Sequence, residues 1–121
     1  MMDTKRLLFL LRQSPYGSSH ALEALETVLV AGVFEQRVSV LFCDEGVWQL
    51  VSDQNGALVN RRTVGRVVQA LPQYDVTDLY VCSRSLAERG LTVDDLTVPV
   101  TVIGVSGQSA LLAVADAVVN D

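Results

Sequence analysis

DLYVCSRSLAERG, from Asp78 to Gly90, is the stretch of sequence that decides the fold. Its first part, DLYVC, is a short and mostly apolar run of the kind that forms buried strands. The part from Ser83 to Arg89 is helical in pattern, and Gly90 stops it. A strand that passes directly into a helix is one half of a βαβ unit, so this stretch predicts an α/β fold.

Similar apolar runs occur on both sides of this stretch: Arg6 to Leu11 (RLLFLL), Arg37 to Cys43 (RVSVLFC) and Val100 to Val105 (VTVIGV). They are mostly continuous rather than alternating, which is typical of strands in parallel sheets that are covered on both faces. The weaker run after Asp116 (AVVND) forms either a last short strand or the end of a helix. The chain therefore holds at least four strand candidates.

Helical patterns fill the intervals between these runs: His20 to Val33 after a Ser18 or Ser19 cap, Thr63 to Leu71 before Pro72, and Ser106 or Ser109 to about Ala115. The alternation of strands and helices predicts a three-layer α/β/α sandwich with a mainly parallel sheet. A length of 121 residues suits one domain, residues 1–121.

Apolar residues make up 50% of the chain, more than a small soluble monomer usually needs. The helix from His20 to Val33 carries two adjacent apolar stripes, where one sheet face needs one. A well-buried helix and contact with another subunit both explain this pattern. Trp48 is likewise either a core residue or an interface anchor. We expect that the isolated chain is not a stable monomer.

Charge and composition exclude several classes of protein. Nine Lys and Arg against fourteen Asp and Glu give a formal charge of −5, so the chain lacks a basic field for nucleic acid. Two cysteines and one histidine offer neither a disulfide scaffold nor a metal-ligand spacing. The apolar run before Arg12 is too short for a signal peptide, and no run approaches a membrane span. We expect a cytoplasmic protein with free thiols and no metal or organic cofactor.

Cys82 is the residue best placed for chemistry, because it ends a predicted strand and precedes a predicted helix. Backbone N–H groups at the helix start, with Arg84 and Arg89 near in sequence, favour a thiolate and predict a lowered pKa. A cysteine in this place is also commonly a small buried apolar residue. Phosphate-ester chemistry is not predicted, because a phosphatase loop needs an arginine where Glu88 stands.

Other candidate sites have weaker patterns. Cys43 also ends a predicted strand, but two carboxylates follow it and disfavour a thiolate, so we interpret it as a packing residue. The loop from Ser14 to Ser19 (SPYGSS) could cradle an anion, yet it lacks a phosphate-binding glycine motif and fits a structural turn. His20 has no recognisable Ser/His/Asp arrangement around it.

Three segments in the same order resemble the DsrE/DsrF-like sulfur-relay family and its TusC (DsrF) type: Pro15 to Ser18 (PYGS), Val40 to Leu50 (VLFCDEGVWQL) and Tyr80 to Leu91 (YVCSRSLAERGL). The resemblance implies a five-stranded parallel sheet in the order 4-3-2-1-5. It implies a heterohexamer with TusB-type and TusD-type subunits, which takes persulfide sulfur from a TusA-type carrier. A TusE-type protein then carries the sulfur towards 2-thiolation of wobble uridine in tRNA, whereas Dsr counterparts serve dissimilatory sulfur metabolism.

The resemblance places Cys82 where the TusD/DsrE-type sister subunit has its persulfide-forming cysteine. It also assigns the main acceptor role to that sister, so the TusC type looks like a structural or accessory partner. Cys82 is therefore a candidate persulfide site in a sulfur-transfer complex. The alternatives are a flavodoxin-like nucleotide or phosphate binder that uses the SPYGSS loop, and a purely structural interaction module.

Overall fold

The computed structural model describes residues 5–15, 19–34, 36–51 and 59–121, with residues 59–63 described by their backbone alone. The strands in this part of the chain are β1 (Arg6–Leu11), β2 (Arg37–Phe42), β3 (Asp78–Cys82), β4 (Thr101–Ile103) and β5 (Ala117–Asn120). The α-helices are α1 (His20–Val33), α2 (Val59–Ala70), α3 (Ser83–Glu88) and α4 (Val105–Val114). Short 3-10 helices are η1 (Asp44–Leu50), η2 (Leu71–Tyr74) and η3 (Val93–Asp95).

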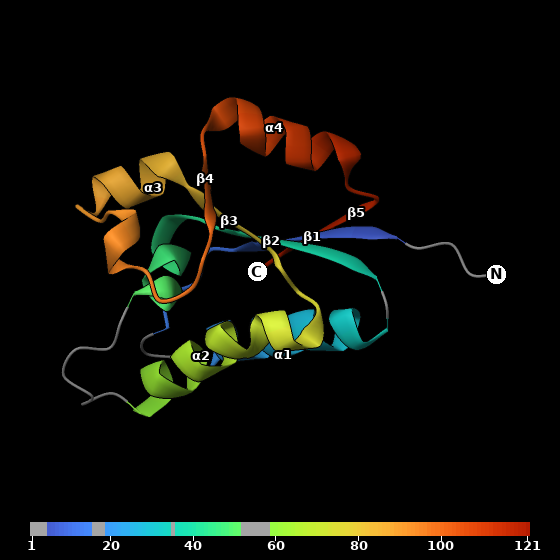
Figure 1. Cartoon of the computed structure of the whole chain (residues 1–121), viewed down its shortest axis with the longest axis horizontal. Helices are drawn as coiled ribbons and strands as arrows, with labels where there is room; N and C mark the ends of the chain where they lie inside the picture. Colours follow the sequence, from blue (N-terminus) through green and yellow to red (C-terminus); the bar gives the residue numbers. More distant parts are fainter. Residues whose placement is uncertain (1–4, 16–18, 35, 52–58) are drawn as a thin grey trace.

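The described strands form one five-stranded sheet in the order β4-β3-β2-β1-β5. Every neighbouring pair is parallel, which confirms the predicted order and direction. Helices α1 and α2 cover one face of the sheet, and α3 and α4 lie over the other (Figure 1). The fold is therefore the predicted α/β/α sandwich, and the last apolar run is a strand rather than the end of a helix.

Two predicted boundaries are wrong by a few residues. Helix α2 begins at Val59 rather than Thr63, and Pro72 lies in the first turn of η2, where its missing N–H costs nothing. Strand β4 ends at Ile103, short of the predicted Val105, because Gly104 caps α4 and the helix turns back over the strand.

The main hydrophobic core lies between the sheet and the α1/α2 layer. Its largest members include Phe9, Phe42, Leu25 and Val68, all buried. Both apolar stripes of α1 are used inside the chain: each supplies buried residues, and their other members pack partly buried against the core. Packing within the chain therefore accounts for both stripes. Trp48, in η1, is partly buried.

The other face of the sheet is covered much less. None of the residues from Thr101 to Asp121 is buried, although this segment includes α4 and the two edge strands β4 and β5. The sequence has no charged residue between Asp95 and Asp116. Large apolar side chains are exposed along it: Val102, Val105, Leu112, Val114, Val118 and Val119. Much of the exposed apolar surface thus lies on α4 and the sheet edges, with a smaller group at the end of α1 (Val30, Val33 and Phe34).

Candidate functional site

Cys82 lies at the carboxyl edge of the sheet, as the last residue of β3 and the N-cap of α3. Its side chain is 9% exposed and lines a cavity of about 470 Å³ beneath α4. The ends of β1 and β2 also reach this cavity, because the parallel register places all three strand ends side by side. The other lining residues are Leu10, Arg12, Leu41, Cys43, Asp44, Arg84, Ser85, Glu88, Gln108 and Leu112.

Hydrogen-bond donors surround the Cys82 sulfur. Burial raises the pKa of this thiol, but hydrogen bonds from the Ser85 hydroxyl and N–H, the Gln108 side chain and the Arg84 N–H outweigh it. The pKa of Cys82 is therefore lower than its ordinary value, in the direction that the sequence predicts. Donors to the charged form stabilise a thiolate, so the surroundings of Cys82 favour the form in which a cysteine is nucleophilic.

Ser85 contributes the largest of these donor effects and is held in place by a second hydrogen bond. Its side chain is almost fully buried, and its Oγ accepts a hydrogen bond of 2.9 Å from the Asp44 N–H. The hydroxyl hydrogen is then free to point at the Cys82 sulfur. Sequence reasoning missed Ser85, because its partner Asp44 lies 41 residues away in the chain.

The backbone around Asp44 has an unusual shape that directs its N–H at Ser85. Asp44 has a φ of 50°, in the left-handed region that few residues other than glycine adopt. Gly46 then passes so close to β1 that a Cβ there would lie 1.9 Å from the carbonyl oxygen of Leu11. Together with the 3.1 Å hydrogen bond from the Cys43 N–H to the same oxygen, this contact fixes the turn against the strand end.

Cys43 has the opposite ionisation to Cys82. Burial, the neighbouring Asp44 carboxylate and the Cys82 thiolate raise the pKa of Cys43 to about 11. It is thus a protonated thiol at neutral pH, in agreement with its interpretation as a packing residue. Both cysteines are free thiols in the structure, as predicted.

The two arginines expected to assist Cys82 have other partners. Arg84 Nε lies 2.7 Å from Glu88 Oε1, in an exposed pair one helical turn apart. Arg89 Nε lies 3.4 Å from Glu45 Oε2, and Arg89 Nη1 donates to the Ser85 carbonyl oxygen over 3.1 Å. The expectation that guanidinium groups lower the pKa of Cys82 is wrong in its cause, because neutral hydroxyl, amide and backbone donors do so instead.

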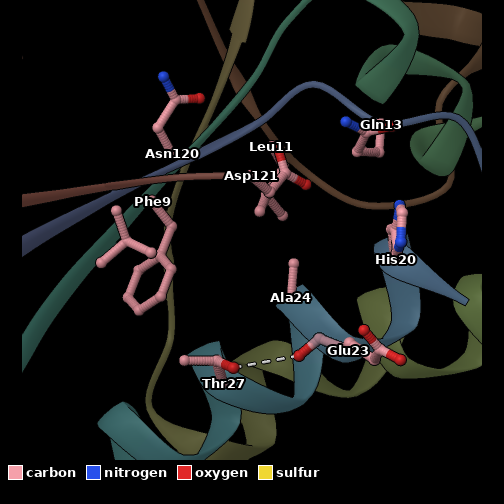
Figure 2. A pocket seen from close by; sticks show the side chains of 10 residues that line it. Phe9, Leu11, Gln13, His20, Glu23, Ala24, Thr27, Asn120 and Asp121 are labelled. Atoms are coloured by element: carbon pink, nitrogen blue, oxygen red, sulfur yellow. Dashed lines mark hydrogen bonds between the residues drawn. The ribbon is translucent and has the colours of Figure 1, made fainter.

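A second cavity, of about 300 Å³, lies on the opposite face of the sheet between β1, β5 and α1 (Figure 2). Phe9 and Leu11 form its apolar floor, while His20, Glu23 and Asp121 bring polar groups to it. Strand alternation turns these side chains away from Cys82. Residues 16–18 of the SPYGSS loop, the predicted anion-site candidate, lie outside the described residues.

The part of the chain that the structure describes has neither a metal-binding cluster nor a membrane-spanning helix. It contains no group of three or more His, Cys, Asp or Glu side chains arranged to hold a metal ion. None of its helices is long and apolar enough to cross a membrane.

Comparison with known proteins identifies the family. The model of the DsrE/DsrF-like family matches residues 5–120. The chain belongs to the DsrE/DsrF-like family. A family relative from Pseudomonas aeruginosa, named "Protein TusC homolog", is 41% identical over 100 residues, which cover 83% of this chain and 84% of the relative. The "Intracellular sulfur oxidation protein DsrF" of Allochromatium vinosum is 42% identical over 92 residues, covering 76% of this chain and 68% of DsrF.

Solved structures show the same fold at lower sequence identity. The ychN protein of E. coli superposes with a TM-score of 0.79 at 16% identity, covering 98% of this chain and 100% of ychN. MTH1491 from Methanobacterium thermoautotrophicum superposes with a TM-score of 0.74 at 23% identity, covering 97% of this chain and 99% of MTH1491. At these identities the match concerns the arrangement of strands and helices.

Proposed function

We propose that this DsrE/DsrF-like chain is a TusC/DsrF-type subunit of a cytoplasmic sulfur-transfer complex that supports 2-thiolation of wobble uridine in tRNA. The observation that carries this proposal is the identity of 41% and 42% to a TusC homolog and to DsrF, over 83% and 76% of the chain. Identity of this level over most of a small domain supports a shared place in the assembly as well as a shared fold.

The uncovered α4 face supports membership of a complex with TusB-type and TusD-type subunits. A helix that is apolar on several sides and carries no charge belongs in a buried environment. In this chain α4 has no buried residue, and the exposed valines of β4 and β5 extend the apolar surface to both sheet edges. Partner subunits would remove this surface from water.

Cys82 supports an accessory role in the sulfur transfer itself. In the proposed step its thiolate attacks the outer sulfur of a persulfide on a TusA-type donor. A bond forms between Cys82 Sγ and that sulfur, the donor S–S bond breaks, and the donor leaves as a thiolate. An acceptor thiolate, such as that of a TusE-type protein, then attacks the outer sulfur and releases Cys82 as a thiolate. The exchange is balanced and consumes no oxidant or cofactor.

The test is to express the tagged chain together with the TusB-type and TusD-type proteins of the same cell and to analyse the purified complex by native mass spectrometry. We expect all three subunit types in one assembly. A strain that lacks the chain should lose 2-thiouridine from its tRNA and recover it with the wild-type gene. Purification without sister subunits would contradict the assembly, and unchanged 2-thiouridine would contradict the tRNA branch.

Cys82→Ser separates an active thiol from a structural module. We expect the Cys82→Ser chain to assemble normally and to reduce sulfur transfer little, because the family resemblance gives the main acceptor role to the sister subunit. Cys43→Ser is the matched control, since Cys43 lines the same cavity. Complete loss of transfer to a TusE-type acceptor with Cys82→Ser alone would mean that Cys82 is an obligatory carrier.

A further inference from the structure

Helix α4 reaches the Cys82 thiol through one side chain. Gln108 lies in its first turn and lines the same cavity as Cys82, where its side chain lowers the pKa of the thiol, and Leu112 lines this cavity one turn later. The outer side of the same helix is open: Val105, its first residue, is 77% exposed. The position of Gln108 therefore depends on a helix that, among the described residues, contacts the chain only on its sheet-facing side.

The two side-chain donors to Cys82 differ in how firmly they are held. Ser85 is almost fully buried and is tied to the Asp44 N–H, so its hydroxyl has one position. Gln108 is only partly buried, and no residue of its helix is buried. Any movement of α4 over the sheet changes the distance of Gln108 from the sulfur and leaves Ser85 in place.

We propose that Gln108 is a positioning residue that links the placement of helix α4, and hence its covering by a partner subunit, to the reactivity of Cys82. A seated helix keeps the Gln108 amide on the sulfur. A displaced helix withdraws it, and the thiolate loses one of its donors. Only the identity of the partner rests on the proposed function, because the link between α4 and Cys82 lies within this chain.

Charged groups around the cavity do not explain this link. The charged side chains that line it with Cys82 are Arg12 after β1, Asp44 after β2, and Arg84 and Glu88 on α3; Cys43, also in the lining, is titratable but protonated at neutral pH. Replacement of Gln108 by alanine leaves all of these charges unchanged. A change in Cys82 ionisation in that variant therefore reports the lost amide donor.

Gly107 offers a way to displace α4 without touching Gln108. A Cβ on Gly107 would lie 2.9 Å from the Cβ of Ile103, so Gly107→Ala pushes the first turn of the helix away from β4. Gly65 in α2 is a matched control, because a Cβ there meets nothing within 4 Å. Ser109→Ala is the control for Gln108, since Ser109 is exposed on the same helix and does not line the cavity.

The experiment measures the rate of Cys82 alkylation by iodoacetamide from about pH 6 to pH 10, by peptide mass spectrometry on the free chain. For Gln108→Ala we expect the midpoint to rise by about half to one pH unit and the rate at neutral pH to fall about three- to tenfold. Gly107→Ala should give a similar shift, and the double variant should give no more than either single one. Gly65→Ala and Ser109→Ala should behave as wild type.

An unchanged midpoint in Gln108→Ala, or fully additive effects in the double variant, would overturn the proposal. Assembly with TusB-type and TusD-type subunits should change the rate of Cys82 alkylation more in the wild-type chain than in Gln108→Ala. Equal changes on assembly would overturn the coupling to a partner. If no complex forms, the proposed function fails, whereas the free-chain profiles still decide the role of Gln108. The two failures are thus distinguishable.

Discussion

On one face of the sheet, α1 and α2 bury a continuous core, whereas on the other face α4 has no buried residue. The first face contains the fully buried side chains of Phe42, Leu25 and Val68. The second contains Cys82, its donors and the exposed apolar side chains of α4. The difference shows that the two faces are built unlike each other: one holds the buried core, and the other combines a cysteine-lined cavity with exposed apolar side chains.

A matched pair of leucines tests this division most directly. Leu25 on α1 is 0% exposed and Leu112 on α4 is 47% exposed. We expect Leu25→Ala to lower the free energy of unfolding by about 2–5 kcal/mol, because it leaves a cavity in the core. Leu112→Ala should lower it by at most about 1 kcal/mol. Urea unfolding of the two variants measures the contrast, and equal losses would mean that α4 contributes to stability as much as α1.

The open face should also hold the more reactive of the two thiols. At pH 7.5 we expect iodoacetamide to alkylate Cys82 at least about tenfold faster than Cys43, because donors favour the Cys82 thiolate and the pKa of Cys43 is raised to about 11. The lower nucleophilicity of a more acidic thiol reduces the advantage but does not reverse it. Peptide mass spectrometry of the free chain gives both rates in one sample. Equal rates would show that the two thiols share one environment.

Association should depend on the α4 face and not on the α1 face. Val105→Glu places a charge on the most exposed apolar residue of α4, at a helix start where an acidic side chain is tolerated. We expect it to weaken subunit association about tenfold or more. Val33→Lys is the matched control, because Val33 is exposed at the end of α1. Sedimentation velocity over a concentration series would show the effect, and equal weakening by both variants would contradict it.

The smallest expected effect is on the pH dependence of stability. The pKa of Cys43 is about 11 in the folded chain, whereas that of an unfolded cysteine is about 8.5. Between these values the unfolded state binds fewer protons, so the free energy of unfolding falls as pH rises. Cys82 acts in the opposite direction, because its folded pKa is lowered: its contribution is present above the unfolded pKa and is lost as pH falls through the folded one.

Cys43→Ala should therefore make stability less sensitive to pH above about pH 8.5. Urea unfolding of wild type and Cys43→Ala at about pH 8 and pH 10 gives the change in the free energy of unfolding with pH for each protein. An equal pH dependence in the two proteins would indicate that Cys43 has the same pKa in the folded and unfolded chain.

Most of the fold could be predicted from the sequence, because it depends on local patterns. Continuous apolar runs predicted the strands, and the junction at Cys82 predicted the strand-to-helix unit. The start of α2 could not be placed, because its first turn has no acidic residue to mark a helix N-terminus. The sequence also could not show whether the second apolar stripe of α1 packs inside the chain, since such a pattern does not distinguish packing within a chain from packing between chains.

The candidate site was predictable only in its central residue. Cys82 is marked by its place between a strand and a helix, which is a property of neighbouring residues. Its donors Ser85 and Gln108 come from two helices, and the Asp44 N–H that fixes Ser85 comes from a third segment. Contacts over such sequence distances depend on the strand order, so spacing along the chain could not reveal them.

The exposed edge strands β4 and β5 have a consequence for the life of this protein in the cell. In the described part of the chain no further strand pairs with their outer edges, and exposed valines lie on both, which makes each a template for pairing with other strands. A chain synthesised in excess over its partners would thus be an orphan subunit, exposed to aggregation, chaperones and proteases. Its abundance should follow that of the partners that cover it, so that synthesis in balanced amounts becomes part of its stability.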